Sequence, residues 1–75
     1  MKARVFVTLK PGVLDPAGKA VENGLHALGY GGVNSVRIGK FFEIDLDAAE
    51  RERLPEMCEK LLANTVIENY RVELL

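Results

Sequence analysis

One cysteine and one histidine are the side chains of this sequence best suited to act as a nucleophile, a general base or a metal ligand. Cys58 falls among apolar positions at helical spacing, with only Lys60 as a close basic neighbour. A catalytic thiolate needs a basic, partly exposed setting, so we interpret Cys58 as a buried core cysteine. His26 lies beside an apolar stripe, which is typical of a flank or interface histidine. Since one cysteine and one histidine on different helices make a poor metal site, we expect no metal and no catalytic residue.

The stretch Arg37-Ile38-Gly39-Lys40 is the strongest cationic cluster. It is either a solvated bend in a strand or a contact with the acidic surface of a partner or an anionic substrate. Residues 29–32, Gly-Tyr-Gly-Gly, have the composition of a phosphate loop. They follow a helix and enter a strand, so no helix N-terminus would face the anion, and we interpret them as a connecting loop.

Length and composition predict one small globular domain, residues 1–75, with 48% apolar residues. Ten Lys and Arg against eleven Asp and Glu give a net charge of −1, so we expect neither nucleic acid nor an anionic membrane as a partner. A lone cysteine and early charges favour the cytoplasm and argue against a secretory signal. A chain this short has a marginal core and no deep pocket of its own, which makes burial against another subunit attractive.

The first part of the chain predicts a strand followed by a helix. Residues 3–10 alternate, with Val5 and Val7 on one face, as in a half-buried strand. Asp15 is suited to cap a helix that has Pro16 at its first position, and Gly29 is suited to end it. An apolar stripe follows at helical spacing: Ala17, Ala20, Val21, Gly24, Leu25 and Leu28.

Residues 33–46 carry apolar side chains at even positions, interrupted by Lys40. Two arrangements keep these residues on one face: a hairpin with a three-residue connection, or one long strand bent at Gly39. We favour the long strand slightly. Its fourteen residues would span about 46 Å, roughly twice the expected domain dimension, so it would extend onto a second protomer.

The remaining residues predict a second helix and a last strand. Asp47 and Glu50 have capping-box spacing, and Glu56 and Lys60 form an i, i+4 pair. Pro55 should kink the helix or start it afresh. The apolar stripe of this helix is Leu54, Met57, Cys58, Leu61 and Leu62. Residues 70–74 alternate as a strand.

This order, β-α-β-α-β with a long bent or split middle strand, predicts an α+β two-layer sandwich related to the ferredoxin-like fold. Both helices should cover one face of a mostly antiparallel sheet. The other face carries Phe6, Phe41 and Leu75, which predicts packing against another sheet in a dimer or higher oligomer.

Three stretches together resemble the PurS family, the small subunit of phosphoribosylformylglycinamidine (FGAM) synthase. They are Val13-Leu14-Asp15-Pro16, Val36-Arg37-Ile38-Gly39-Lys40 and residues 58–70, which read CEKLLANTVIENY. The likeness runs in order over nearly the whole chain, and the last stretch is long and specific.

The resemblance implies a PurS-like fold and a non-catalytic subunit. The family's complex converts formylglycinamide ribonucleotide, glutamine and ATP to the amidine, glutamate, ADP and phosphate. A PurQ-type glutaminase frees ammonia, a PurL-type synthetase holds ATP and Mg²⁺, and the small subunit forms a homodimer or tetramer that bridges them. Family position implies subunit contacts at Arg37, Gly39, Lys40, Asn64, Thr65 and Tyr70. The alternative is a ferredoxin-like regulatory module for a small ligand, which would have a polar cleft at a dimer interface.

Overall fold

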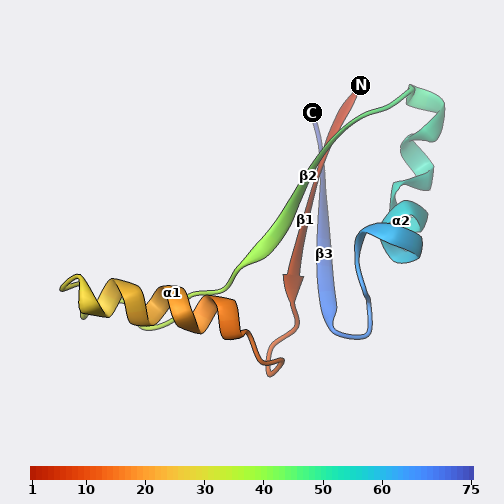
Figure 1. Ribbon diagram of the computed structural model, residues 1–75. Helices are drawn as coiled ribbons and strands as arrows, with labels where there is room; N and C mark the ends of the chain where they lie inside the picture. The colour runs from red at the N-terminus through yellow and green to blue at the C-terminus, as the bar shows by residue number, and fades with distance from the viewer.

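The computed structural model describes residues 1–75 and contains a three-stranded antiparallel sheet with helical segments in both connections. The elements are β1 (Lys2–Leu9), α1 (Pro16–Ala27), β2 (Gly39–Asp45), η1 (Ala48–Arg53), α2 (Leu54–Met57), η2 (Cys58–Leu62) and β3 (Glu68–Leu74). β1 is the central strand, and the two termini lie at the same end of the sheet (Figure 1). The predicted α+β class and element order are confirmed.

The core lies on one face of β1, where the alternating residues Ala3, Val5 and Val7 are completely buried. The helical segments between β2 and β3 cover this face with Leu54 and Cys58, which are also buried. The alternation predicted for residues 3–10 and the core position of Cys58 are therefore confirmed. Partly buried side chains from the flanking strands and the helix end complete the cluster: Phe42, Ile44, Leu62, Tyr70 and Val72.

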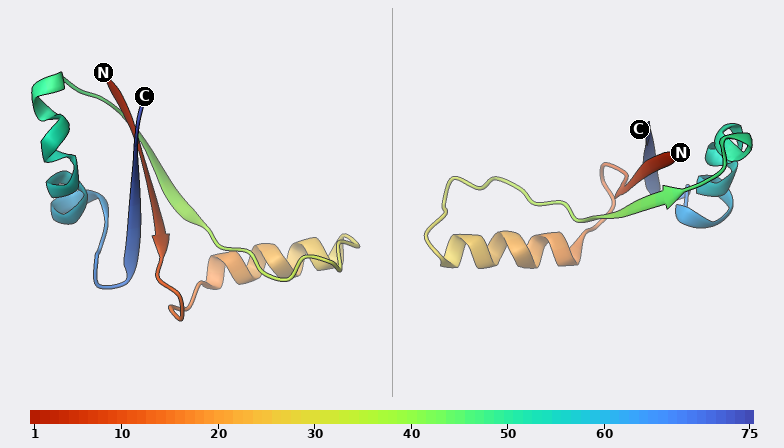
Figure 2. Two further views of the ribbon diagram at one scale, coloured as in Figure 1. Left: turned by 180° about the vertical axis from the view of Figure 1, so that it is seen from behind. Right: turned by 90° about the horizontal axis from the view of Figure 1, so that it is seen from above.

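α1 begins and ends as predicted, but it does not cover the sheet. The carboxylate of Asp15 accepts from the backbone N–H of Gly18, and Gly29 adopts a φ of +99° just beyond the helix. Figures 1 and 2 show α1 projecting away from the three strands. Its apolar stripe is open, with Val21 44% and Leu28 75% exposed. The expectation that both helices cover one sheet face is wrong for α1, because α1 packs alongside the extended residues 33–38 instead of the sheet.

Residues 33–46 form no hairpin at Gly39. β2 starts at Gly39 and pairs with β1 along its whole length, from Gly39 opposite Thr8 to Asp45 opposite Lys2. Residues 33–38 are extended but belong to no sheet, and they run alongside α1 (Figure 2). The hairpin is excluded, whereas the favoured fourteen-residue strand is confirmed only for its second half, Gly39–Asp45. Its extension onto a second protomer stays a prediction.

The second helix combines three geometries around Pro55: a 3₁₀ turn in η1, an α-helical turn in α2 and a π turn in η2. Pro55 has no N–H to give to the carbonyl of Arg51, and Leu54 donates to that carbonyl in a 3₁₀ bond instead. The predicted new start near Pro55 and the Glu56–Lys60 pair, at 2.7 Å, are confirmed. The capping box is wrong, because the side chain of Asp47 makes no cap bond.

The molecule is more extended than a compact chain of its length. Its radius of gyration is 15.6 Å and its longest dimension is 49 Å, whereas compact packing gives a radius of roughly 11 Å. Its accessible surface is 5375 Å², against about 4,600 Å² for a compact monomer of this mass. About 800 Å² of additional surface is therefore open, because α1 stands apart from the sheet.

The longest helix, α1, has 12 residues, and none of the helices combines the length and apolar character needed to cross a membrane.

Candidate assembly surfaces

All six residues implied as subunit contacts lie toward one end of the sheet, where β1 ends and β2 and β3 begin (Figure 1). We call this region the sheet end: Arg37, Gly39, Lys40, Asn64, Thr65 and Tyr70. The strand register explains the gathering, since Val7 of the central strand pairs with Lys40 on one side and with Tyr70 on the other. Residues separated by thirty positions in the chain therefore share one edge of the molecule.

Glu68, which was not among the predicted contacts, connects the two halves of the sheet end. Its carboxylate lies 3.5 Å from the ammonium group of Lys40 and accepts a 2.7 Å hydrogen bond from the backbone N–H of Asn64. The side chain of Glu68 is only 13% exposed, whereas that of Lys40 is 55% exposed. This ion pair spans the central strand and leaves the Lys40 side chain open to solvent.

Four of the other predicted contacts also have roles within the chain. Arg37 donates from Nη2 to the carbonyls of Leu9 and Lys10, at 2.6 and 3.1 Å. At Gly39 a Cβ atom would overlap the carbonyl oxygen of Val7, so a glycine lets β2 approach β1 here.

Asn64 and Tyr70 shape the turn into β3. The side-chain oxygen of Asn64 accepts from the N–H of Val66 at 3.2 Å, which forms a local turn. The Tyr70 hydroxyl donates to Glu59 at 3.3 Å, and desolvation, followed by the negative charge of Glu59, raises the pKa of Tyr70. Thr65 is exposed and forms no side-chain hydrogen bond. The sheet end is thus a fixed turn that presents Lys40 and Thr65 outward.

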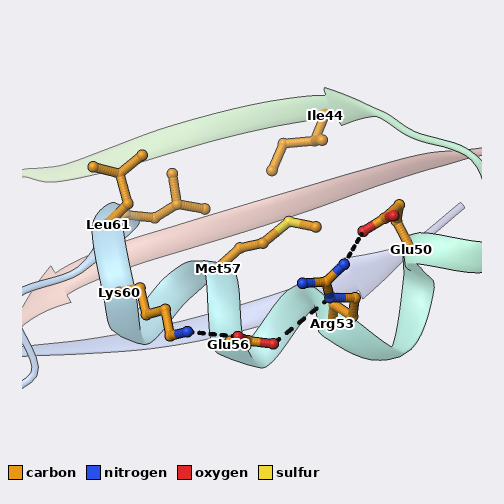
Figure 3. A pocket seen from close by; sticks show the side chains of 8 residues that line it. Ile44, Glu50, Arg53, Glu56, Met57, Lys60 and Leu61 are labelled. Atoms are coloured by element: carbon orange, nitrogen blue, oxygen red, sulfur yellow. Dashed lines mark hydrogen bonds and ion pairs between the residues drawn. The ribbon is translucent and has the colours of Figure 1, made fainter.

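A second open surface is a groove of about 440 Å³ between β2 and the second helix (Figure 3). Its apolar floor consists of Ile44 from β2 with Met57, Leu61 and Leu62 from the helix. Leu61 is 84% exposed, so the predicted core stripe of this helix is correct for Leu54 and Cys58 but not for Leu61. A chain of ion pairs on the helix lines the other side of the groove: Glu50–Arg53, Arg53–Glu56 and Glu56–Lys60 (Figure 3).

The third open surface is the sheet face opposite the core. Phe6 and Phe41 pair across β1 and β2 with ring centroids 5.2 Å apart, and the guanidinium of Arg71 lies 4.3 Å above the ring of Phe6. Phe41 is 53% and Leu75 58% exposed. The predicted apolar character of this face is confirmed, and charged side chains of Lys2, Glu43, Arg71 and Glu73 surround it.

The two residues considered for nucleophilic or base chemistry are engaged in the fold. Burial, reinforced by the charge of Glu59, raises the pKa of the Cys58 thiol, so it stays protonated at neutral pH and is a poor nucleophile. A ring nitrogen of His26 lies 2.6 Å from the carbonyl oxygen of Val33, which ties the end of α1 to the returning chain. No group of three or more His, Cys, Asp or Glu side chains is close enough to share an ion.

The fold and these three open surfaces define a small α+β subunit whose features are those of protein–protein contact. The model of the PurS family, described as FGAM synthase, matches residues 2–75. The chain is 56% identical to the PurS subunit of FGAM synthase from Synechocystis, over 95% of this chain and 75% of that protein. It is 52% identical to the subunit from Bacillus subtilis, over 96% of this chain and 89% of that one.

Solved structures give the same assignment. B. subtilis PurS superposes with a TM-score of 0.88 at 51% identity, covering 96% of this chain and 94% of that one. A chain in the structure of PurLQS from Thermotoga maritima superposes with a TM-score of 0.84 at 31% identity, covering 99% and 95%. This chain therefore belongs to the PurS family, the small subunits of the FGAM synthase of purine biosynthesis.

Proposed function

We propose that this chain bridges the glutaminase and synthetase subunits of FGAM synthase and supports the transfer of ammonia between them. The complex converts formylglycinamide ribonucleotide, glutamine and ATP to the amidine, glutamate, ADP and phosphate. In this proposal the chain supplies no catalytic group and binds no cofactor, while ATP and Mg²⁺ bind to the synthetase. A cytoplasmic location fits the single cysteine, which has no disulfide partner.

The observation that carries the proposal is the gathering of the six contact residues at the sheet end. They come from two separate stretches of sequence, residues 37–40 and 64–70, and the Glu68 ion pair and the Asn64 turn hold them in one arrangement. A rigid surface of this kind costs little conformational entropy when a partner binds. We therefore assign the sheet end to contact with the larger subunits, with Lys40 and Thr65 as its outward-facing residues.

We also propose that the chain associates with a second copy of itself through α1 and the groove. In a two-layer sandwich the first helix would lie beside the second one, over β2, and the groove floored by Ile44 and Met57 occupies that position. The apolar stripe of α1 is open and matches this floor in character. The excess surface of about 800 Å² equals one partner's share of a standard interface. Two chains that exchange α1 would complete each other's helical layer.

The bridging role is tested by reconstituting the complex with a glutaminase and a synthetase of the same family. We expect one assembly containing all three chains, measured by sedimentation velocity with glutamine and ATP present. Thr65→Arg with Lys40→Glu should weaken that assembly at least about tenfold, because both changes lie on the exposed part of the sheet end. Lys2→Glu, a charge reversal at the opposite end of β1, is the matched control. Equal assembly by the wild type and the double variant would contradict the assignment.

A further inference from the structure

α1 and residues 30–38 form an arm that leaves the sheet (Figure 2), and side-chain hydrogen bonds join the helix to the returning chain. At its far end His26 meets the carbonyl of Val33. At its near end Arg37 donates to the carbonyls of Leu9, the last residue of β1, and of Lys10, the residue after it. The direction of the arm is therefore set where it meets the sheet.

Asp15 lies at this junction, and both of its carboxylate oxygens accept hydrogen bonds. Oδ1 accepts from the N–H of Gly18 at 2.9 Å, which is the ordinary bond of a helix cap. Oδ2 accepts from the N–H of Ile38 at 3.1 Å, and Ile38 directly precedes the first residue of β2. A helix cap requires only the first of these bonds, so the second joins the start of α1 to the start of β2.

The close approach of these two segments depends on Gly18. A Cβ atom at this position would overlap the carbonyl oxygen of Val36 and the carboxylate of Asp15. Gly18 is buried although α1 is otherwise largely exposed. The helix start therefore rests directly on the extended chain, within reach of a single carboxylate.

From this geometry we infer that Asp15 is a positioning residue that fixes the direction of the arm relative to the sheet, in addition to capping α1. Without the Oδ2 bond, the arm is joined to the sheet by the bonds of Arg37 and by the backbone at residues 10–14 and 38–39. Gly12, with a φ of +85°, lies in the first of those connections, where the chain can pivot. Because the arm carries the apolar stripe, its direction decides whether α1 reaches the groove of a second copy. That consequence rests on the proposed self-association, whereas the role of Asp15 within one chain does not.

The test compares Asp15→Asn with Asp47→Asn, the same change at a helix cap whose side chain makes no cap bond. Asparagine caps a helix as well as aspartate, so helicity by circular dichroism and the exchange rate of the Gly18 amide should not change. The asparagine side chain has a single acceptor oxygen, which caps the helix at Gly18 and leaves the N–H of Ile38 without an acceptor. The Ile38 amide should therefore exchange with solvent about tenfold faster, as expected for loss of one hydrogen bond. Asp15→Ser, which also retains a single cap acceptor, should give the same result.

Two readouts separate the inference from the proposed self-association. Hydrogen exchange at Ile38, measured on dilute protein, reports on Asp15 whether or not the chain associates, and an unchanged rate in both variants would overturn the inference. The dissociation constant of the self-associated form should rise about tenfold for Asp15→Asn and stay constant for Asp47→Asn. In a chain whose association is weakened by Leu28→Ala, faster exchange with an unchanged dissociation constant for Asp15→Asn would overturn the role in directing the arm. A wild-type chain that stays monomeric would contradict the proposed self-association, and the exchange rate at Ile38 would then decide the role of Asp15 by itself.

Discussion

Leu28, the last residue of the apolar stripe, offers the sharpest test of self-association through α1. It follows Ala27 at the end of the helix and is 75% exposed in the single chain. If α1 lies in the groove of a second copy, Leu28 becomes buried there. Leu28→Ala should then weaken association without changing the stability of the single chain, because a substitution at an exposed position costs little in the monomer.

The size of the effect follows from the carbon atoms removed. Leucine to alanine removes three carbons, each contributing about 0.8 kcal/mol when buried. Three quarters of this side chain is available for burial on association, which gives about 1.8 kcal/mol per site. A two-fold symmetric dimer contains the site twice, so the loss is about 3.6 kcal/mol and the dissociation constant rises about 400-fold.

Sedimentation velocity over a dilution series measures this constant for the wild type and for Leu28→Ala. Val66→Ala is the matched control, because Val66 is 81% exposed and lies on neither the arm nor the groove. We expect its dissociation constant to stay within about twofold of the wild type. A wild-type chain that stays monomeric, or equal effects of both substitutions on the dissociation constant, would contradict self-association through α1.

Two further predictions concern the single chain. Gly39→Ala should lower the free energy of unfolding by about 1–3 kcal/mol, because the added Cβ would force β2 away from Val7. Gly24→Ala should raise the free energy of unfolding by about 0.5–1 kcal/mol, because Gly24 lies in a helix with open space around it. Urea unfolding measures both changes. The second concerns acid. The N–H groups of Gly18 and Ile38, followed by the charge of Arg37, hold the pKa of Asp15 below its ordinary value of 3.8. The stability that the ionised Asp15 contributes is therefore fully present above pH 3.8 and is lost as the pH falls through the lowered pKa. Protection of the Ile38 amide should therefore persist at about pH 5 and disappear only in stronger acid; loss of protection near neutral pH would contradict this cause.

The strands and helix starts were predictable because their causes are local. Alternation placed Val5 and Val7 in the core, and the Asp15–Pro16 pair marked the first turn of α1. The capping box at Asp47 failed because the residues after it form a 3₁₀ helix, η1, that has no side-chain cap, whereas the spacing assumed an α-helix. A local pattern predicts structure correctly where the contacts that it requires come only from residues close in the sequence.

The direction of α1 could not be read from its own residues. Its apolar stripe indicates that the helix is covered, but the covering surface need not belong to the same chain. Glu68 and the second bond of Asp15 were missed for a related reason, since each joins residues that become neighbours only after folding. Family resemblance implied the sheet-end residues as contacts, which stays a prediction, and the strand register supplies the physical reason why they lie together.

The bridging role is tested most directly by measuring amidine formation with two nitrogen sources. A synthetase and a glutaminase are assayed with and without this chain, once with glutamine and once with a saturating ammonium salt. We expect glutamine-dependent turnover to require the chain and ammonium-dependent turnover not to require it, because free ammonia needs no transfer between subunits. Equal glutamine-dependent turnover with and without the chain would contradict the bridging role.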